Sequence, residues 1–82
     1  MIYGYANKTI NEFGLLEMRE VSFSASPAVL REIAKFLDEM AAGMESSGEL
    51  SVHWHRHIQD EIPGWRDRFP DNDIVVCAPG KV

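Results

Sequence analysis

The sequence predicts a single α+β domain, a two-layer sandwich in which one amphipathic helix packs on a four-stranded, mainly antiparallel sheet. The 82 residues leave room for one hydrophobic core, so the domain is expected to span residues 1–82. One long helical pattern occupies the middle of the chain, and two strand-like segments lie on each side of it. This strand–strand–helix–strand–strand order lets the helix cover one face of the sheet and leaves the other face open.

The first two strands are predicted at residues 1–8 and 15–25, which are rich in aromatic and branched side chains. The end of the second strand places three apolar side chains on one face: Val21, Phe23 and Ala25. Its beginning has two apolar residues of the opposite parity: Leu16 and Met18. Because side chains alternate along a strand, we predict a β-bulge near Arg19–Glu20 that re-aims the chain.

The central helix is predicted to begin after Ser26, which is a good N-cap, with Pro27 at the first helical position. We expect the helix to fade near Gly43 and to end before Glu45. Its apolar residues recur at steps of three and four, and are expected to pack in the core: Leu30, Ile33, Leu37, Met40 and Met44, with Val29 and Phe36 widening the stripe.

Two further strands are predicted at residues 49–57 and 73–79, separated by a long loop at 59–73. The loop contains two prolines, a glycine and two large aromatic residues, and we expect no regular secondary structure in it. Such a loop favours a functional role. The sheet is expected to meet the helix through these residues: Val21, Phe23, Val52, Trp54, Ile58, Ile74 and Val76.

The third strand contains all three histidines of the chain in the segment "VHWHRHI". Strict alternation places Val52, Trp54 and Ile58, together with Arg56, on one face of the strand. His53, His55 and His57 then lie on the opposite, uncovered face. We therefore look for function on this face.

A metal site is one interpretation of the histidines. Positions two apart on a strand are separated by about 7 Å, so neighbouring imidazoles such as His53 and His55 could share a zinc ion with Asp60 or Glu61. The outer pair, about 13 Å apart, could not readily do so. A small zinc-binding protein that uses paired histidines is therefore the alternative function, although the spacing does not specify a site.

Catalysis is not predicted, and no cofactor is expected. Histidine with nearby carboxylates can perform acid–base chemistry. However, the chain contains no nucleophile elbow, no glycine-rich phosphate loop and no recognisable triad order. The flat face of a small sheet also lacks the concavity that a substrate needs.

An interaction surface is the interpretation that we favour, because imidazoles flanked by carboxylates and aromatics can hydrogen-bond and pack at once. Trp65 would be its apolar anchor. The predicted partner-binding residues are His53, His55, His57, Asp60, Glu61, Trp65 and Arg66. In the competing interpretation, the histidines line a solvated face, and Trp65 and Phe69 fasten the long loop to the sheet edge. Homodimerisation through a sheet edge or the histidine face is a third alternative.

Composition and charge limit the class of partner and the compartment. The single cysteine, Cys77, excludes an internal disulfide framework and fits a reducing compartment. The chain shows neither a secretion signal nor the roughly 20 apolar residues of a membrane span, so we expect a cytoplasmic protein with no membrane partner. A net charge of −5 argues against a nucleic-acid ligand and favours basic partners, although solubility alone also explains mild acidity.

Several segments together resemble the immunity protein 32 family of bacterial polymorphic toxin systems. They are "VSFSASPAVLREIAKFL", the histidine-rich strand ending in "HIQD", "PGW" and "DIVV", and the resemblance runs from about residue 2 to residue 77. It implies a cytosolic antidote that binds and blocks a cognate toxin without chemistry of its own. Many toxins of such systems are nucleases with basic surfaces, which an acidic partner would complement.

Overall fold

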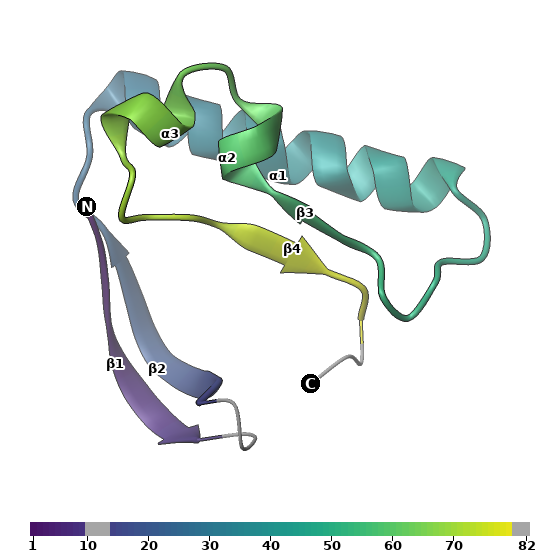
Figure 1. The fold of residues 1–82 in the computed structure, drawn as a ribbon, viewed down its shortest axis with the longest axis horizontal. Helices are drawn as coiled ribbons and strands as arrows, with labels where there is room; N and C mark the ends of the chain where they lie inside the picture. The colour runs from purple at the N-terminus through teal and green to yellow at the C-terminus, as the bar shows by residue number, and fades with distance from the viewer. Residues whose placement is uncertain (10–13, 80–82) are drawn as a thin grey trace.

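The computed structural model describes residues 1–9 and 14–79. The elements are, in chain order, β1 (Ile2–Thr9), β2 (Leu16–Phe23), α1 (Pro27–Ser46), β3 (His55–His57), α2 (Ile58–Glu61), α3 (Trp65–Arg68) and β4 (Val75–Cys77). The α+β class is confirmed, but the single four-stranded sheet with one helix is wrong. The described residues form three helices and two separate antiparallel sheets, β1–β2 and β3–β4 (Figure 1).

The β1–β2 hairpin contains the predicted bulge. Tyr5 pairs with Glu20 and the next residue, Ala6, pairs with Met18, so Arg19 has no partner across the strands. The bulge prediction is therefore confirmed. A second shift in register, after Ala6, leaves Asn7 as an extra residue on β1.

These shifts give the hairpin one apolar and one polar face. Its apolar face, which the register assembles from both strands, consists of Ile2, Gly4, Ala6, Leu16, Met18, Val21 and Phe23. On the polar face, Lys8 lies 3.8 Å from Glu17, and the Arg19 guanidinium lies 5.3 Å from the centre of the Tyr5 ring. The bulge thus brings the two halves of β2 into phase.

Helix α1 begins as predicted, because the Ser26 hydroxyl accepts a hydrogen bond from the Val29 amide at 3.3 Å and Pro27 opens the helix. It continues past Gly43 to Ser46, further than predicted. At this end the Gly43 carbonyl accepts hydrogen bonds from both the backbone amide of Ser47, at 3.1 Å, and its hydroxyl, at 2.6 Å. A glycine costs a helix only about 1 kcal/mol, too little to end it here.

The β3–β4 ribbon is shorter than predicted. Residues 52 and 53 lie in a turn, in which the Trp54 amide donates to the Ser51 carbonyl at 3.1 Å. Three residue pairs then form the antiparallel ribbon: His55 with Cys77, Arg56 with Val76, and His57 with Val75.

The segment predicted as an unstructured loop contains the short helices α2 and α3, so that prediction is wrong. Ile58, Ile62, Trp65 and Phe69 follow one another at steps of four, three and four residues, as on an amphipathic helix. The Pro63–Gly64 pair divides this pattern in two, with Gly64 at a φ of +78° that favours glycine. Both helices turn their apolar side chains towards α1.

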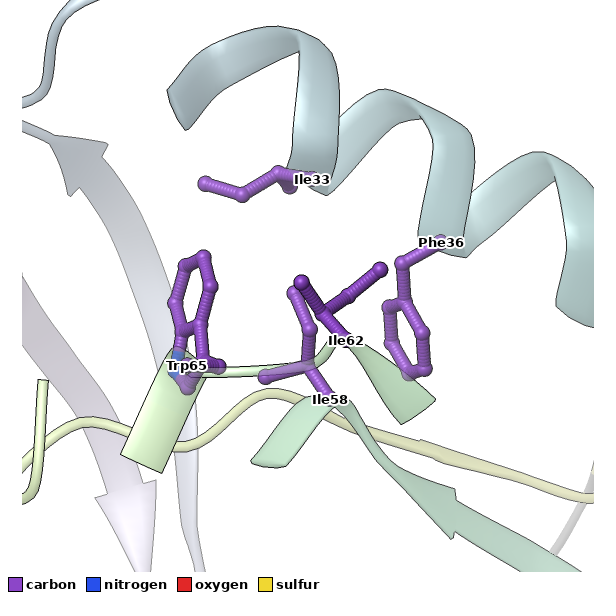
Figure 2. Packing of buried hydrophobic residues seen from close by; sticks show 5 residues of the cluster. All are labelled: Ile33, Phe36, Ile58, Ile62 and Trp65. Atoms are coloured by element: carbon purple, nitrogen blue, oxygen red, sulfur yellow. The ribbon is translucent and has the colours of Figure 1, made fainter. Parts of the chain in front are cut away.

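The core lies between α1 and the α2–α3 pair (Figure 2). Ile33 and Phe36 point from α1 towards side chains of the other two helices, and these five residues form the buried cluster: Ile33, Phe36, Ile58, Ile62 and Trp65. Six partly buried residues pack around it: Met1, Val29, Met40, Phe69, Ile74 and Val76. Ile58, Ile74 and Val76 thus meet the helix side of the molecule as expected.

Other predicted core residues are exposed. Val21 and Phe23 on the hairpin are 49% and 41% exposed, Val52 is 60% exposed, and Leu30 and Leu37 of the helix stripe are 42% and 45% exposed. The assignments on α1 and the hairpin are wrong because α2 and α3, not the hairpin, cover α1. The assignment of Val52 is wrong because this residue lies in the turn before β3. The hairpin instead extends away from the other elements (Figure 1).

The chain has a larger accessible surface than a compact monomer of its mass. The accessible surface is 6002 Å², whereas a folded monomer of 9.3 kDa is expected to expose about 5,000 Å². The radius of gyration is 13.7 Å, compared with about 12 Å for a compact domain of this length. The excess of about 1,000 Å² has the size of one side of a protein interface.

Candidate functional site

The outer face of the β3–β4 ribbon brings two of the three histidines together. Residues directly opposite one another in an antiparallel pair share a face, so His55 and His57 lie beside Cys77 and Val75. The two imidazole rings meet edge to face, with centroids 5.2 Å apart. The predicted alternation is confirmed for this pair.

His57 is held by a carboxylate from the segment before β4. Its Nδ1 lies 2.6 Å from Oδ2 of Asp73, and because an ionised carboxylate only accepts hydrogen bonds, Nδ1 is the donor. Oδ1 of Asp73 accepts from the backbone amides of Gln59 and Ile74 at 3.3 and 2.9 Å. The His57 side chain, at the N-cap of α2, makes no capping bond itself, so Asp73 supplies that acceptor from a distant part of the chain.

His53 does not share the strand with the other two histidines. It is exposed in the turn before β3, where its carbonyl oxygen lies 2.9 Å from Nδ1 of His55. The expectation of three histidines on one strand face is therefore wrong for His53. Two hydrogen bonds to Ser51 form the turn: its hydroxyl oxygen accepts from the His53 amide, and its carbonyl oxygen accepts from the Trp54 amide.

Asp60 and Arg66 are brought together by the turn between α2 and α3, with the Arg66 guanidinium 2.9 Å from Oδ1 of Asp60. Both side chains remain well exposed, and Glu61 is exposed on α2 next to Asp60. An exposed ion pair of this kind contributes only about 0–1 kcal/mol to stability. These three side chains are therefore accessible to a partner at little cost.

Trp65 does not lie on the surface, so its expected role as an exposed anchor is wrong. The side chain is fully buried, its indole Nε1 donates to the Asn72 carbonyl at 2.9 Å, and its ring lies 4.7 Å from that of Phe69. The competing expectation, that Trp65 fastens this segment down, is closer to its actual place. A buried tryptophan contributes a large apolar area once its N–H has an acceptor.

Two residues outside the predicted partner-binding set shape this region, Asp73 and Arg68. Arg68 donates to both carboxylate oxygens of Glu32 on α1, at 3.0 and 3.2 Å, which ties α3 to α1. Neither contact has a local sequence signal, since both depend on α2 and α3 being helical. Recognition of the four-three-four apolar spacing after His57 could have revealed them.

The described residues do not form a set of side chains suited to bind a metal ion. Within residues 1–9 and 14–79, no three histidine, cysteine, aspartate or glutamate side chains are placed so that they could hold a metal ion. The His57–Asp73 pair resembles the orienting pair of an acid–base site, but its carboxylate is already engaged in holding α2 and β4 together. Hydrogen bonding and charge pairing are what this surface offers.

Comparison with known proteins gives no assignment. No family model matches the chain, and no curated protein or solved structure is significantly similar to it. The resemblance to immunity protein 32 therefore rests on its sequence motifs alone. Among the described helices, none is long and apolar enough to cross a bilayer.

Proposed function

We propose that this chain is a toxin-neutralising immunity protein, which binds a cognate bacterial toxin in the cytoplasm and blocks it without catalysis. The observation that carries the proposal is a polar surface on α2, α3, β3 and the turn before β3, here called the histidine surface. Five of its residues are exposed and His57 is half-buried: His53, His55, His57, Asp60, Glu61 and Arg66. The family resemblance supplies the class of partner. We propose that this partner binds at the histidine surface.

The histidine surface is backed by the buried core of the molecule, which favours a binding role. Ile58, Ile62 and Trp65 are buried directly behind α2 and α3, and Asp73 fixes His57 through a bond to the ring. Polar groups that are already ordered lose less conformational entropy when a partner binds. The surface can therefore present hydrogen-bonding groups in a defined arrangement.

Charge favours a basic partner, such as the nucleases of many toxin systems. The chain carries a net charge of −5, and Asp60 and Glu61 are exposed on the histidine surface. Complementary charge accelerates encounter and suppresses wrong partners more than it raises affinity. Asp60 could exchange Arg66 for a basic side chain of the toxin.

The test is a calorimetric titration with the product of the neighbouring gene, expressed as an inactivated variant. We expect one-to-one binding in the nanomolar range, and at least a tenfold loss in His55→Ala and in Asp60→Asn. Lys35→Ala, an exposed change on α1 outside the histidine surface, is the control and should bind like the wild type. Absence of heat at micromolar concentrations would contradict the function, whereas binding unaffected by both variants would contradict the surface.

A further inference from the structure

The hairpin exposes its apolar face to solvent. Four side chains from β2 are 41–49% exposed: Leu16, Met18, Val21 and Phe23. Isolated two-stranded hairpins are at best marginally stable in water unless another element covers them. This face therefore requires a cover that the described part of the chain does not provide.

Helix α1 carries a second uncovered apolar surface. One apolar stripe of α1 is covered, with Ile33 and Phe36 buried and Val29 and Met40 half-buried. A parallel stripe beside it, also at steps of four, three and four residues, is exposed throughout: Leu30, Ala34, Leu37 and Ala41. The apolar arc of α1 is thus about twice as wide as the part that α2 and α3 cover. We call these four residues the outer stripe of α1.

The two surfaces do not meet within one chain. The strands β1 and β2 pack chiefly on each other, and the base of the hairpin is closed by a bond from the Ser24 amide to the Met1 carbonyl at 2.8 Å. From this base the hairpin points away from α1 (Figure 1). Each surface is the kind of apolar cover that the other lacks.

We propose that a second copy of this chain covers both surfaces: the apolar face of each hairpin lies on the outer stripe of α1 of the other copy. Such a reciprocal exchange obeys two-fold symmetry and closes without leaving a free surface for further copies. The excess exposed area of about 1,000 Å² compares well with the roughly 800 Å² that each partner buries in a standard interface. This inference goes beyond the proposed function and does not depend on it.

Charge favours a second copy over the basic partner proposed for the histidine surface. The four charged residues of β1 and β2 cancel, so the acidic excess of the chain lies outside these two strands: Lys8, Glu17, Arg19 and Glu20. None of them lies on the apolar face, and the outer stripe of α1 contains only leucine and alanine. A basic toxin would meet no carboxylate on either surface, whereas another copy needs only apolar contact.

The test is the mass in solution, measured by sedimentation equilibrium on the full chain between about 1 and 200 μM. We expect wild type to reach twice its monomer mass of 9.3 kDa. Val21→Lys on the hairpin and Leu37→Glu on the outer stripe should each shift the protein to monomer. Their matched controls place the same charge on the opposite sides of the same elements, Ser22→Lys and Ala42→Glu, and should remain dimeric.

An equimolar mixture of Val21→Lys and Leu37→Glu distinguishes the reciprocal arrangement from other dimers. In the mixed dimer one junction keeps both native surfaces, and the other carries opposite charges, so we expect the dimer to return. Dimers through hairpins alone would survive Leu37→Glu, and dimers through helices alone would survive Val21→Lys. Circular dichroism checks the folding of each variant, and Met18→Lys replaces any hairpin variant that unfolds.

A wild-type protein that stays monomeric at 200 μM overturns the proposal. It would mean that the hairpin folds onto its own helix or receives a different partner. Persistence of the dimer in Leu37→Glu would equally overturn the exchange. Neither result involves the toxin titration, so the two proposals fail separately.

Discussion

The hairpin and the rest of the molecule use similar residues and reach opposite results. The body, formed by α1, α2, α3 and the β3–β4 ribbon, buries Phe36, Ile58 and Trp65 completely. The longer β1–β2 hairpin has an apolar face of its own, yet every residue of β2 is exposed. Strand pairing satisfies the backbone of the hairpin, but only a covering layer removes its apolar side chains from water. The difference lies in what covers each region, not in its composition.

The largest difference in stability between the two regions is expected when an aromatic residue of each is replaced by alanine. Trp65→Ala removes a fully buried ring and should cost about 3–5 kcal/mol of unfolding free energy. A domain of this length has about 4–12 kcal/mol in total, so this variant approaches complete unfolding. Tyr5→Ala, at a site 61% exposed, loses the contact between its ring and the Arg19 guanidinium and should cost about 0.5–1 kcal/mol. Urea denaturation followed by circular dichroism measures both, and similar losses would refute the contrast.

Gly4→Ala should damage the hairpin and spare the body. A β-carbon at Gly4 would overlap the backbone carbonyl oxygen of Glu20 on the paired strand and the Met18 methyl group. The strands must shift apart, at a cost of about 1–3 kcal/mol. Amide exchange should accelerate within β1 and β2 alone. Equal acceleration in α1 would show that the two regions unfold as one.

Gly43→Ala is the matched change in the body and has the opposite sign. Its new methyl group meets no atom within 4 Å, and Gly43 lies inside α1 at an ordinary helical conformation. Replacing a helical glycine by alanine should therefore stabilise the chain by about 0.5–1 kcal/mol. The midpoint of thermal unfolding should rise. An unchanged midpoint would indicate that α1 frays before its last turn, and a fall would contradict the prediction.

Local signals in the sequence predicted the hairpin strands, the bulge at Arg19 and the start of α1 at Ser26, because each depends on neighbours within a few residues. The separation of the strands into two sheets was not predictable in this way. Because Pro63 and Gly64 interrupt the helical pattern, the segment that forms α2 and α3 was predicted to be a loop. These two helices pack on the face of α1 that the sheet was expected to cover. Which element packs on α1 depends on contacts between distant parts of the chain, which local sequence patterns do not reveal.

The same limit applies to the histidine surface. The contact between His55 and His57 followed from alternation along a strand, a local rule. The bond from His57 to Asp73 and the burial of Trp65 depend on α2 and α3. Whether an aromatic residue in a predicted loop is exposed or buried therefore depends on the secondary structure that the loop adopts.

Arg19, the extra residue of the bulge, determines which face of the hairpin each side chain of β2 occupies. Counted along the sequence alone, the apolar residues of β2 fall on both parities, and only the extra residue sets Leu16 and Met18 in step with Val21 and Phe23. Removal of this one position would turn half of the ribbon inside out while leaving its composition almost intact. In this hairpin the number of residues in β2 is therefore a stricter constraint than the identity of its side chains. Selection should remove insertions and deletions in β2 more strongly than substitutions.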